Sequence, residues 1–435
     1  MSQTLNDTPL GSRLHIGIFG RRNAGKSSLI NALTNQDAAI VSDIPGTTTD
    51  PVRKAMEIQP LGPVVIIDTA GIDDTGSLGE ARIRHTLRVL DKTDVALLVL
   101  DPQAGTDRYE DELADRIVGA GVPLIAVANK TDLGLGDDAL VAWAASRGLP
   151  LARCSATTRQ GIDIVRTLLI KHAPTGWVMP TILGDLIQPG DAVVLVVPID
   201  KAAPKGRLIL PQVMTIRDVI DNEAHAVVVK ERELRHCLST LARQPALVVT
   251  DSQALLKASV DTPPQVPFTS FSILFGRYKG DLEALARGAR AVDDLRPGDK
   301  VLIAEACTHH PVGDAIGQVQ IPRWLRQHVG GELDFSFVAG QDYPEDLSPY
   351  GLVVHCGGCM INRQEMLSRI ERAERAGTPI VNYGVLLGRM HGVLERALTP
   401  FPLALMAYER AEDERLPTGL PLAARGQKCA ARRRA

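Results

Sequence analysis

Short aliphatic runs alternate with longer amphipathic stretches in the N-terminal part of the chain. Four of the runs have the length of a strand and are mostly aliphatic, at residues 14–19, 64–68, 95–100 and 123–129. Continuous apolar runs of this length are typical of strands covered on both faces of a parallel sheet. The stretches between them are long enough for helices, so the pattern predicts a doubly wound, mostly parallel α/β sheet.

Breaks in this pattern divide the chain into three parts. The segment APTGWVMPT at residues 173–181 indicates a linker, and the proline-rich DTPPQVPF at residues 261–268 indicates a second boundary. The predicted domains are residues 1–175, 176–266 and 267–435.

Further aliphatic runs predict that the second and third parts are α/β domains as well. The candidate strands there are residues 192–197, 224–229, 246–250, 300–306, 333–339, 352–354 and 379–383. A helix is expected at residues 363–376, with Asn362 as its N-cap.

Composition and charge narrow the class of protein. Apolar residues make up 45% of the chain and charged residues 23%, which is ordinary for a globular protein. The 48 lysines and arginines stand against 51 acidic residues, which gives a formal net charge of −3. Because no overall basic field exists to attract nucleic acid, we predict no nucleic-acid partner.

The sequence also indicates where the protein is located. No apolar stretch approaches the ~20 residues of a membrane-spanning helix. The first residues contain no apolar run of signal-peptide length. Six cysteines are too few for a disulfide framework. We therefore predict a cytoplasmic protein without a membrane span.

The octapeptide GRRNAGKS fits the phosphate-binding loop pattern G-x-x-x-x-G-K-[ST]. It follows an expected strand and opens an expected helix, as the motif requires. Gly20 and Gly25 let backbone N–H groups curl around phosphate oxygens, and the helix N-terminus adds a partial positive charge. Lys26 would reach the β- and γ-phosphates, and the Ser27 hydroxyl would bind Mg²⁺. The loop therefore predicts a nucleoside triphosphate bound with magnesium.

Three downstream motifs complete this site and select the base. DTAG ends the second expected strand and places Asp68 near the magnesium and the Gly71 amide near the γ-phosphate. NKTD ends the fourth, where Asn129 faces a purine and the Asp132 carboxylate accepts from N1–H and the exocyclic amine of guanine. Adenine has no donor at N1, so this carboxylate selects guanine. CSA at residues 154–156 would close over the base.

The order and spacing of these motifs resemble those of the GTPase superfamily, so we expect GTP and GDP as ligands. The predicted nucleotide-binding residues are Gly20, Asn23, Ala24, Gly25, Lys26, Ser27, Ser28, Thr47, Thr48, Asp68, Gly71, Asn129, Lys130, Asp132, Ser155 and Ala156.

Finer features resemble one subgroup, the potassium-stimulated GTPases related to the tRNA-modification GTPase. The likeness runs through GRRNAGKSSLINAL and AAIVSDIPGTTTD. In that subgroup the loop asparagine, here Asn23, and switch-I carbonyls hold K⁺ against the phosphates. The second threonine of GTT, here Thr48, binds Mg²⁺. The resemblance thus implies K⁺ as well as Mg²⁺ at this site.

The residue that orients the attacking water is not the usual glutamine. Ile72 stands where many small GTPases carry a water-orienting glutamine. Glu80 lies at the same offset after DTAG as the subgroup's catalytic glutamate, although from the residues alone it also fits a solvated carboxylate at a helix start. We predict Lys26, Thr48 and Glu80 as the catalytic set, and slow intrinsic hydrolysis that potassium stimulates.

A second candidate site lies in the third part of the chain. CTHHP follows one expected strand and HCGGC follows another. Neighbouring strand ends are where α/β sheets bind ligands, so Cys307, Cys356 and Cys359 can offer three thiolates together. Three thiolates suit an iron–sulfur cluster or zinc, and a C-x-x-C alone also suits a redox pair. The candidates for a fourth ligand position are His309, His310 and His355.

The spacing of this motif resembles that of one family. C-x-H, then the 45 residues 310–354, then H-C-x-x-C is similar to the cluster motif of the HydF family, the GTPases that mature iron-only (FeFe) hydrogenases. With the GTPase motifs, the resemblance covers essentially the whole chain. It implies that the three cysteines bind a [4Fe–4S] cluster and that His355 or His309 is a candidate for its remaining iron. The predicted metal-binding residues are Cys307, Cys356, Cys359, His355, His309, Ser27, Thr48 and Asn23.

The resemblance also implies a scaffold function. In the family, two radical S-adenosylmethionine enzymes build a two-iron precursor, and the scaffold passes it to the apo-hydrogenase. GTP would act as a switch on partner binding, the middle domain would form homodimers, and the third domain would support homotetramers. Two other functions stay open: an RNA-modification-type GTPase with a structural zinc domain, and a redox-responsive GTP switch.

Overall fold

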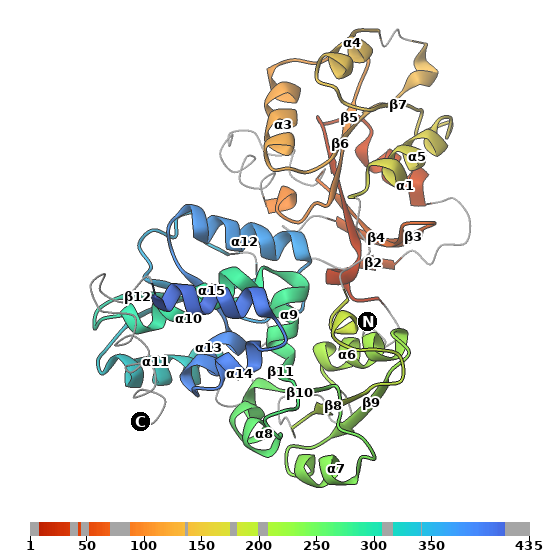
Figure 1. The fold of residues 1–435 in the computed structure, drawn as a ribbon. Coiled ribbons are helices and arrows are strands. Elements are labelled where there is room, and N and C mark those ends of the chain that lie inside the picture. The colour runs from red at the N-terminus through yellow and green to blue at the C-terminus, as the bar shows by residue number, and fades with distance from the viewer. Residues whose placement is uncertain are drawn as a thin grey trace. The chain divides into compact units, whose positions relative to one another are not determined.

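The chain folds into two compact units in the computed structural model (Figure 1). The first unit comprises residues 1–180 and 360–368, and the second comprises residues 181–359 and 369–435. The structure describes residues 8–34, 42–44, 52–69, 88–134, 138–174, 181–198, 208–306, 316–340 and 342–413. Within these ranges, every helix is too short or too polar to cross a bilayer.

The first unit is built on a seven-stranded sheet with the order β2-β3-β4-β1-β5-β6-β7. Its strands are β1 (Leu14–Phe19), β2 (Ser42–Ile44), β3 (Val52–Ile58), β4 (Gly62–Asp68), β5 (Val95–Leu100), β6 (Leu124–Ala128) and β7 (Leu151–Arg153). Strand β3 runs antiparallel to both of its neighbours, and the other pairs are parallel. The four aliphatic runs are strands as predicted. Strands β2 and β3, at one edge of the sheet, were not among the predicted strands.

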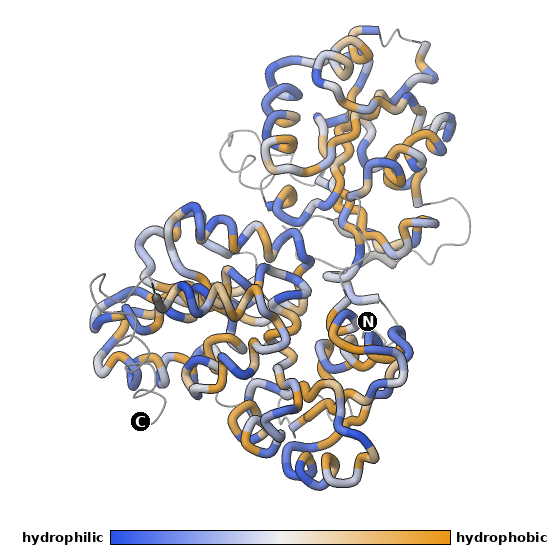
Figure 2. Tube along the Cα trace, viewed as in Figure 1, coloured by the Kyte–Doolittle hydropathy of each residue, from blue (hydrophilic) through white to orange (hydrophobic). Residues whose placement is uncertain are grey.

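Helices cover both faces of this sheet. They are α1 (Lys26–Thr34), α3 (Arg108–Gly119), α4 (Asp138–Ser146) and α5 (Ile162–His172), with the 3₁₀ turns η1 (Leu10–Ser12) and η3 (Thr131–Leu133). Because successive strand side chains point to opposite faces, Ile16 and Ile66 pack with α1 and α5, whereas Val65 and Leu98 pack with α3 and α4. Figure 2 shows the hydrophobic residues concentrated in these strands. Both faces are thus buried, as the predicted doubly wound sheet requires.

Asp94 is a buried carboxylate in this unit, immediately before β5. Its Oδ2 accepts from the His15 backbone N–H at 2.8 Å, and the His15 ring Nδ1 lies 3.8 Å away. The Asn362 amide lies 3.5 Å from the same oxygen. Burial raises the pKa of Asp94 to about 7. The folded protein therefore keeps a proton on Asp94 between about pH 4 and pH 7 that the unfolded chain releases, and stability falls as pH rises through this window.

We expect Asp94→Asn to raise the melting temperature at pH 8 by several degrees and to change it much less at pH 5, because asparagine removes only the cost of the buried charge. Thermal unfolding of both proteins at the two pH values measures this. Asp163→Asn, at an exposed position on α5, is the control and should show no such pH dependence. Equal shifts at both pH values would contradict the prediction.

The second unit contains two four-stranded parallel sheets. The first has the order β11-β10-β8-β9. Its strands are β8 (Ala192–Val196), β9 (His225–Val229), β10 (Leu247–Thr250) and β11 (Phe268–Ser270). The three predicted strands are present, and β11 pairs with β10 as a fourth. The predicted boundary between residues 266 and 267 thus falls before the last strand of this sheet, because the proline-rich segment leads into an edge strand.

The second sheet has the order β13-β12-β14-β15. Its strands are β12 (Lys300–Glu305), β13 (Asp334–Ala339), β14 (Leu352–His355) and β15 (Ile380–Asn382). Its neighbouring strands are all parallel. The carboxyl ends of β12 and β14 therefore lie side by side, which brings the chain after Glu305 next to the chain after His355.

The remaining helices complete the second unit. They are η4 (Gly184–Leu186), α6 (Leu210–Asp221), α7 (Leu234–Thr240), η5 (Ser252–Ala254), α8 (Leu255–Asp261), α9 (Phe271–Lys279), α10 (Leu282–Arg290), η6 (Ala291–Asp294), the π-helix η7 (Ile316–Gln320), α11 (Ile321–Val329), α13 (Tyr383–Met390), α14 (Leu394–Leu398) and α15 (Pro402–Asp413). Helix α12 (Arg363–Arg375) contributes residues to both units. The Glu365 backbone N–H donates to Asn362 Oδ1 at 3.0 Å, which confirms Asn362 as the N-cap of α12.

Candidate functional site

The phosphate-binding loop joins β1 to α1 through left-handed backbone turns. These turns occur at Gly20 (φ 136°), Asn23 (φ 64°) and Gly25 (φ 92°). A Cβ atom on Gly20 would lie 2.3 Å from the Val99 carbonyl oxygen, so only glycine fits there. Asparagine tolerates the left-handed conformation better than most residues. Turns of this kind let successive N–H groups face one anion, and both Asn23 and Ser28 are exposed beside them.

Arg21, within this loop, is tied to α3. Its guanidinium donates to both carboxylate oxygens of buried Glu110, at 2.5 and 2.9 Å, and also pairs with Asp107. These hydrogen bonds raise the pKa of Arg21. Asp107 and Glu110 also form the capping box of α3. The loop is therefore restrained by residues outside it, a feature that the motif does not predict; the D-x-x-E pattern at the start of α3 signals only the capping box.

Lys26 opens α1 and is only 4% exposed. Its Nζ donates to the carbonyl oxygens of Gly20 at 2.8 Å and Arg21 at 2.7 Å. The ammonium group is therefore held inside the curve of the loop, where the phosphates of a nucleotide would lie. Charge-assisted hydrogen bonds in so sheltered a place are stronger than those at the surface.

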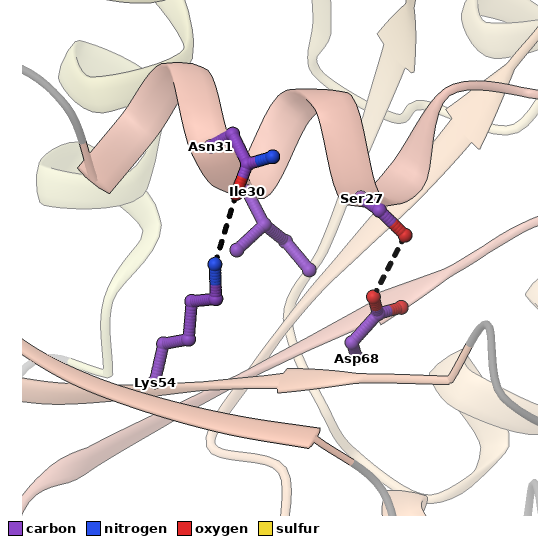
Figure 3. A pocket seen from close by; sticks show the side chains of 5 residues that line it. All are labelled: Ser27, Ile30, Asn31, Lys54 and Asp68. Carbon is purple, nitrogen blue, oxygen red and sulfur yellow. Dashed lines mark hydrogen bonds between the residues drawn. The ribbon is translucent and has the colours of Figure 1, made fainter. Parts of the chain in front are cut away.

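Ser27 and Asp68, the residues expected to hold magnesium, are brought together. Ser27 Oγ donates to Asp68 Oδ2 at 2.9 Å (Figure 3). Both line a cavity of about 30 Å³ with Ile30, Asn31 and Lys54. Lys54 Nζ donates to Asn31 Oδ1 at 2.9 Å, across the cavity from the carboxylate (Figure 3). A space of this size accommodates one or two waters beside Asp68 and Ser27.

Asn129, after β6, links two parts of the nucleotide site. Its side-chain amide donates to the Ala24 carbonyl at 3.0 Å, and its Oδ1 accepts from the Ala156 N–H at 3.0 Å. The side chain is almost fully buried. Asn129 therefore positions the phosphate-binding loop against residues 154–156. This role was not predicted from the sequence, and the contact of Asn129 with a purine stays a prediction.

The other base-binding residues shape the mouth of the site. Asp132 lies in η3 and is exposed, so its carboxylate is accessible to guanine. Lys130 has a left-handed backbone, and its Nζ donates to Asp101 Oδ2 at 2.6 Å. Ser155 is buried, and its Oγ accepts from the Thr158 N–H at 3.1 Å.

We expect Gly25→Ala to weaken GTP binding at least tenfold and to lower the free energy of unfolding by about 2 kcal/mol. A Cβ atom there would lie 2.2 Å from Asn129 Nδ2, on a backbone with φ 92°. Nucleotide titration and chemical denaturation measure the two effects. Gly121→Ala is the matched control, because Gly121 also has a positive φ but faces open space. Equal losses of GTP affinity in the two variants would show that the contact with Asn129 is unimportant.

The cysteine loop follows β14 in the second unit. Cys356 Sγ accepts from the backbone N–H groups of Ala306 at 3.1 Å and Gly358 at 3.4 Å. Such N–H···S bonds stabilise a thiolate, which is the form that binds metals. Cys356 and Cys359 are both partly exposed. The Ala306 contact also places the end of β12 beside Cys356, so the two described cysteines offer thiols of the kind that bind iron or zinc.

Buried side chains contact both ends of this loop. His355 Nδ1 lies 2.7 Å from the Cys356 carbonyl oxygen, and its Nε2 lies 3.0 Å from Arg369 Nη1. Burial, with the nearby Arg369 charge, lowers the pKa of His355 to about 3. Lys279 Nζ donates to the Cys359 carbonyl at 3.1 Å. Neither Lys279 nor Arg369 was predicted for this site, although a basic residue on the apolar face of a helix is a signal for both.

Several predicted site residues lie outside the part of the chain that the structure describes, and their roles stay predictions. They are Thr47, Thr48, Gly71, Glu80, Cys307, His309 and His310. Among the described residues, no three His, Cys, Asp or Glu side chains are grouped to hold a metal. Cys307, the first cysteine of the cluster motif, is not among the described residues.

Comparison with protein families accounts for most of the chain. Residues 15–130 match the 50S ribosome-binding GTPase domain. With the phosphate-binding loop and the base-binding motifs in place, the chain is a P-loop GTPase. Residues 182–280 match the hydrogen maturase F dimerization domain, and residues 283–400 match its tetramerization domain. The chain belongs to the HydF family of hydrogenase maturation GTPases.

Curated relatives match the GTPase part. The tRNA modification GTPase MnmE of Chromobacterium violaceum is 41% identical over 159 residues, covering 36% of this chain and 34% of that protein. MnmE of Azoarcus sp. is 40% identical over 171 residues, covering 39% of this chain and 36% of that protein. The chain thus spans about a third of the length of these relatives.

Among solved structures, the chain is similar to the G domain of the T. maritima FeoB iron transporter. That match has 22% identity, a TM-score of 0.28 and coverage of 37% of this chain and 99% of that chain. Another match is a single-residue variant of Aquifex aeolicus Era bound to GDP·AlF₄⁻, with 19% identity, a TM-score of 0.31 and coverage of 50% of this chain and 92% of that chain.

Proposed function

We propose that this GTPase binds a [4Fe–4S] cluster, receives a two-iron precursor and delivers it to an apo-hydrogenase. The observation that carries the proposal is the Cys356–Cys359 loop, which lies beside the end of β12 in a chain of the HydF family. Neither the cysteine loop nor the GTPase domain alone selects this function. A C-x-x-C loop also suits zinc, and a similar GTPase domain occurs in MnmE.

The nucleotide half of the proposal rests on the arrangement in the first unit. Lys26 would contact the β- and γ-phosphates, and Ser27 and Asp68 would hold Mg²⁺. Asp132 would select guanine. Asn23 is exposed and has a left-handed backbone conformation. It is the proposed protein ligand of K⁺. We propose slow hydrolysis that K⁺ stimulates.

Two further residues of the nucleotide site are proposed from the family resemblance. Thr48 would bind Mg²⁺ from switch I, and Glu80 would act on the attacking water.

The cluster half rests on the cysteine loop. Cys356 and Cys359, together with Cys307, would supply three thiolates to the cluster. When bound, such a cluster offers one iron whose ligand can exchange, and this is the chemistry that a carrier of another iron compound needs. His309, His355 and an exogenous ligand are the proposed alternatives for that iron.

Partner exchange would follow the state of the nucleotide. We propose that GTP binding and hydrolysis change contacts with the radical S-adenosylmethionine maturases and with the apo-hydrogenase. The matches to a dimerization and a tetramerization domain support a homo-oligomer, and a homodimer or homotetramer is the proposed state. The cytoplasmic location stays a prediction.

The test is the iron and acid-labile sulfide content of the full chain, purified without oxygen and reconstituted with iron and sulfide. About four of each per chain, with thiolate-to-iron absorption near ~400 nm, support the proposal. One zinc per chain without sulfide would make the third domain structural and would overturn it. Incubation of the loaded protein with apo-hydrogenase then tests delivery, because hydrogenase activity should appear only after precursor has been supplied.

A further inference from the structure

The cysteine loop is fastened at both of its ends by side chains from inside the second unit. The Cys356 carbonyl oxygen lies within hydrogen-bond distance of the His355 ring, and the Cys359 carbonyl accepts from Lys279. His355 is 0% exposed and Lys279 is 1% exposed. Lysine is rarely buried to this extent, so its position under the loop needs an explanation.

The partners of His355 determine where its proton lies. An arginine guanidinium only donates, so His355 Nε2 must accept the hydrogen bond from Arg369 Nη1. A neutral imidazole carries its one proton on the other nitrogen, and Nδ1–H therefore donates to the Cys356 carbonyl. Neither ring nitrogen retains a free lone pair for iron.

Arg369 is itself fixed. Its Nη2 donates to the Gly340 carbonyl at 2.7 Å, just after β13, and its guanidinium carbon lies 5.0 Å from the centre of the Tyr343 ring. The side chain is 4% exposed. A hydrogen-bonded chain thus runs from the end of β13 through Arg369 and His355 to Cys356.

We propose that Arg369, acting through His355, and Lys279 are positioning residues for the cluster loop, and that His355 is held outside the set of iron ligands. This inference rests on the proposed cluster site. It leaves His309, His310, another side chain or a ligand from outside the protein for the fourth iron position.

Two physical effects follow for the cluster. The side chains of His355 and Lys279 hold the carbonyls at the ends of the loop, and this constrains how the thiols between them can be oriented. A buried guanidinium two hydrogen bonds from Cys356 also stabilises the more negative, reduced state of a nearby cluster. Removing this charge should therefore lower the reduction potential.

The first experiment compares reduction potentials of the reconstituted full chain. Arg369→Met should keep iron and sulfide near wild-type content but shift the potential to a more negative value. Arg369→Lys should restore part of the shift, because it keeps the charge. Arg375→Met, on the exposed side of the same helix, is the control and should leave the potential unchanged. Equal potentials in wild type and Arg369→Met would overturn the electrostatic role.

Lys279→Met tests the other end of the loop. We expect faster loss of iron to a chelator than in the wild type, because the Cys359 carbonyl loses its donor. Lys300→Met, at an exposed position on β12, is the matched control. Wild-type rates of iron loss in Lys279→Met would overturn its positioning role.

The ligand assignment is tested by spectroscopy. In the apo-protein, ¹⁵N NMR of the histidine rings should show His355 with its proton on Nδ1. In the dithionite-reduced cluster, pulsed EPR should show the same nitrogen couplings in wild type and His355→Asn. A histidine coupling that disappears in His355→Asn would overturn the inference. If that variant does not fold, the tautomer of the wild-type ring decides the question, because a proton on Nε2 contradicts the hydrogen-bond chain.

Failure of this inference differs from failure of the proposed function. A wild-type protein that assembles no iron and sulfide overturns both. A wild-type protein with about four irons and a potential that does not respond to Arg369→Met leaves the scaffold function standing and removes only the role of Arg369.

Discussion

Replacing Lys26 by alanine is expected to slow GTP hydrolysis by about 10²–10³-fold while leaving the iron and sulfide content unchanged. The Lys26 ammonium is nearly buried and fixed by two loop carbonyls, so it opposes the charge on the phosphates without first having to be ordered. Alanine leaves the backbone N–H groups of the loop but removes this charge. Phosphate release at saturating GTP, with Mg²⁺ and K⁺ present, measures the loss.

The control for Lys26→Ala is Lys171→Ala, at an exposed position on α5. It removes the same charge from the same unit and should hydrolyse GTP at the wild-type rate. Hydrolysis by Lys26→Ala within a few-fold of wild type would contradict the assignment of the phosphate site. Loss of the cluster together with hydrolysis would contradict the separation of the two sites.

Cys356→Ser is expected to give the opposite result in the second unit. The Cys356 sulfur accepts two backbone N–H bonds, and a serine hydroxyl in its place is a poor ligand for iron. We expect less than about half of the wild-type iron and sulfide after reconstitution, with the visible absorption reduced in proportion. GTP turnover should stay within about twofold of wild type, because none of the phosphate-binding residues lies in this unit.

Cys237→Ser provides the matched control, since Cys237 is a partly exposed cysteine on α7 of the same unit. It should assemble as much iron as the wild type. Full iron content in Cys356→Ser would remove this residue from the cluster site. Equal losses in both variants would indicate a general sensitivity to thiol loss.

The central strands of the first sheet were predictable because they are buried along their whole length. The run VALLVL in β5 is apolar from end to end, which is typical of a strand packed on both faces. Such a run can be recognised as a strand from its own residues, without knowledge of its partners. Strand β11 is only three residues long and follows prolines, so its own residues do not predict a strand. It is a strand because it pairs with β10, which lies 18 or more residues away in sequence. Local patterns do not contain that information.

The sites divide in the same way. The phosphate-binding loop is a contiguous motif, and its two glycines are needed because both have positive φ angles. The sequence alone therefore locates the loop. The restraint of Arg21 by Glu110 joins residues 89 apart, and the bond from Asn129 to Ala24 joins residues 105 apart. Arg369 beside His355 is another contact that only the tertiary structure creates. Chemistry carried by neighbours in sequence was predictable, and the residues that position it were not.

The parallel pairing of β12 with β14 sets an order of events during synthesis. Cys307 leaves the ribosome 49 residues before Cys356, a delay of roughly 2–10 s at ordinary rates of translation. The N–H of Ala306 reaches the Cys356 sulfur only after β14 has been made and has joined the sheet. A growing chain can therefore offer at most one of the three thiols at a time in this interval. The proposed cluster can therefore be bound by all three thiols only after residues 352–359 have been made and β14 has joined the sheet.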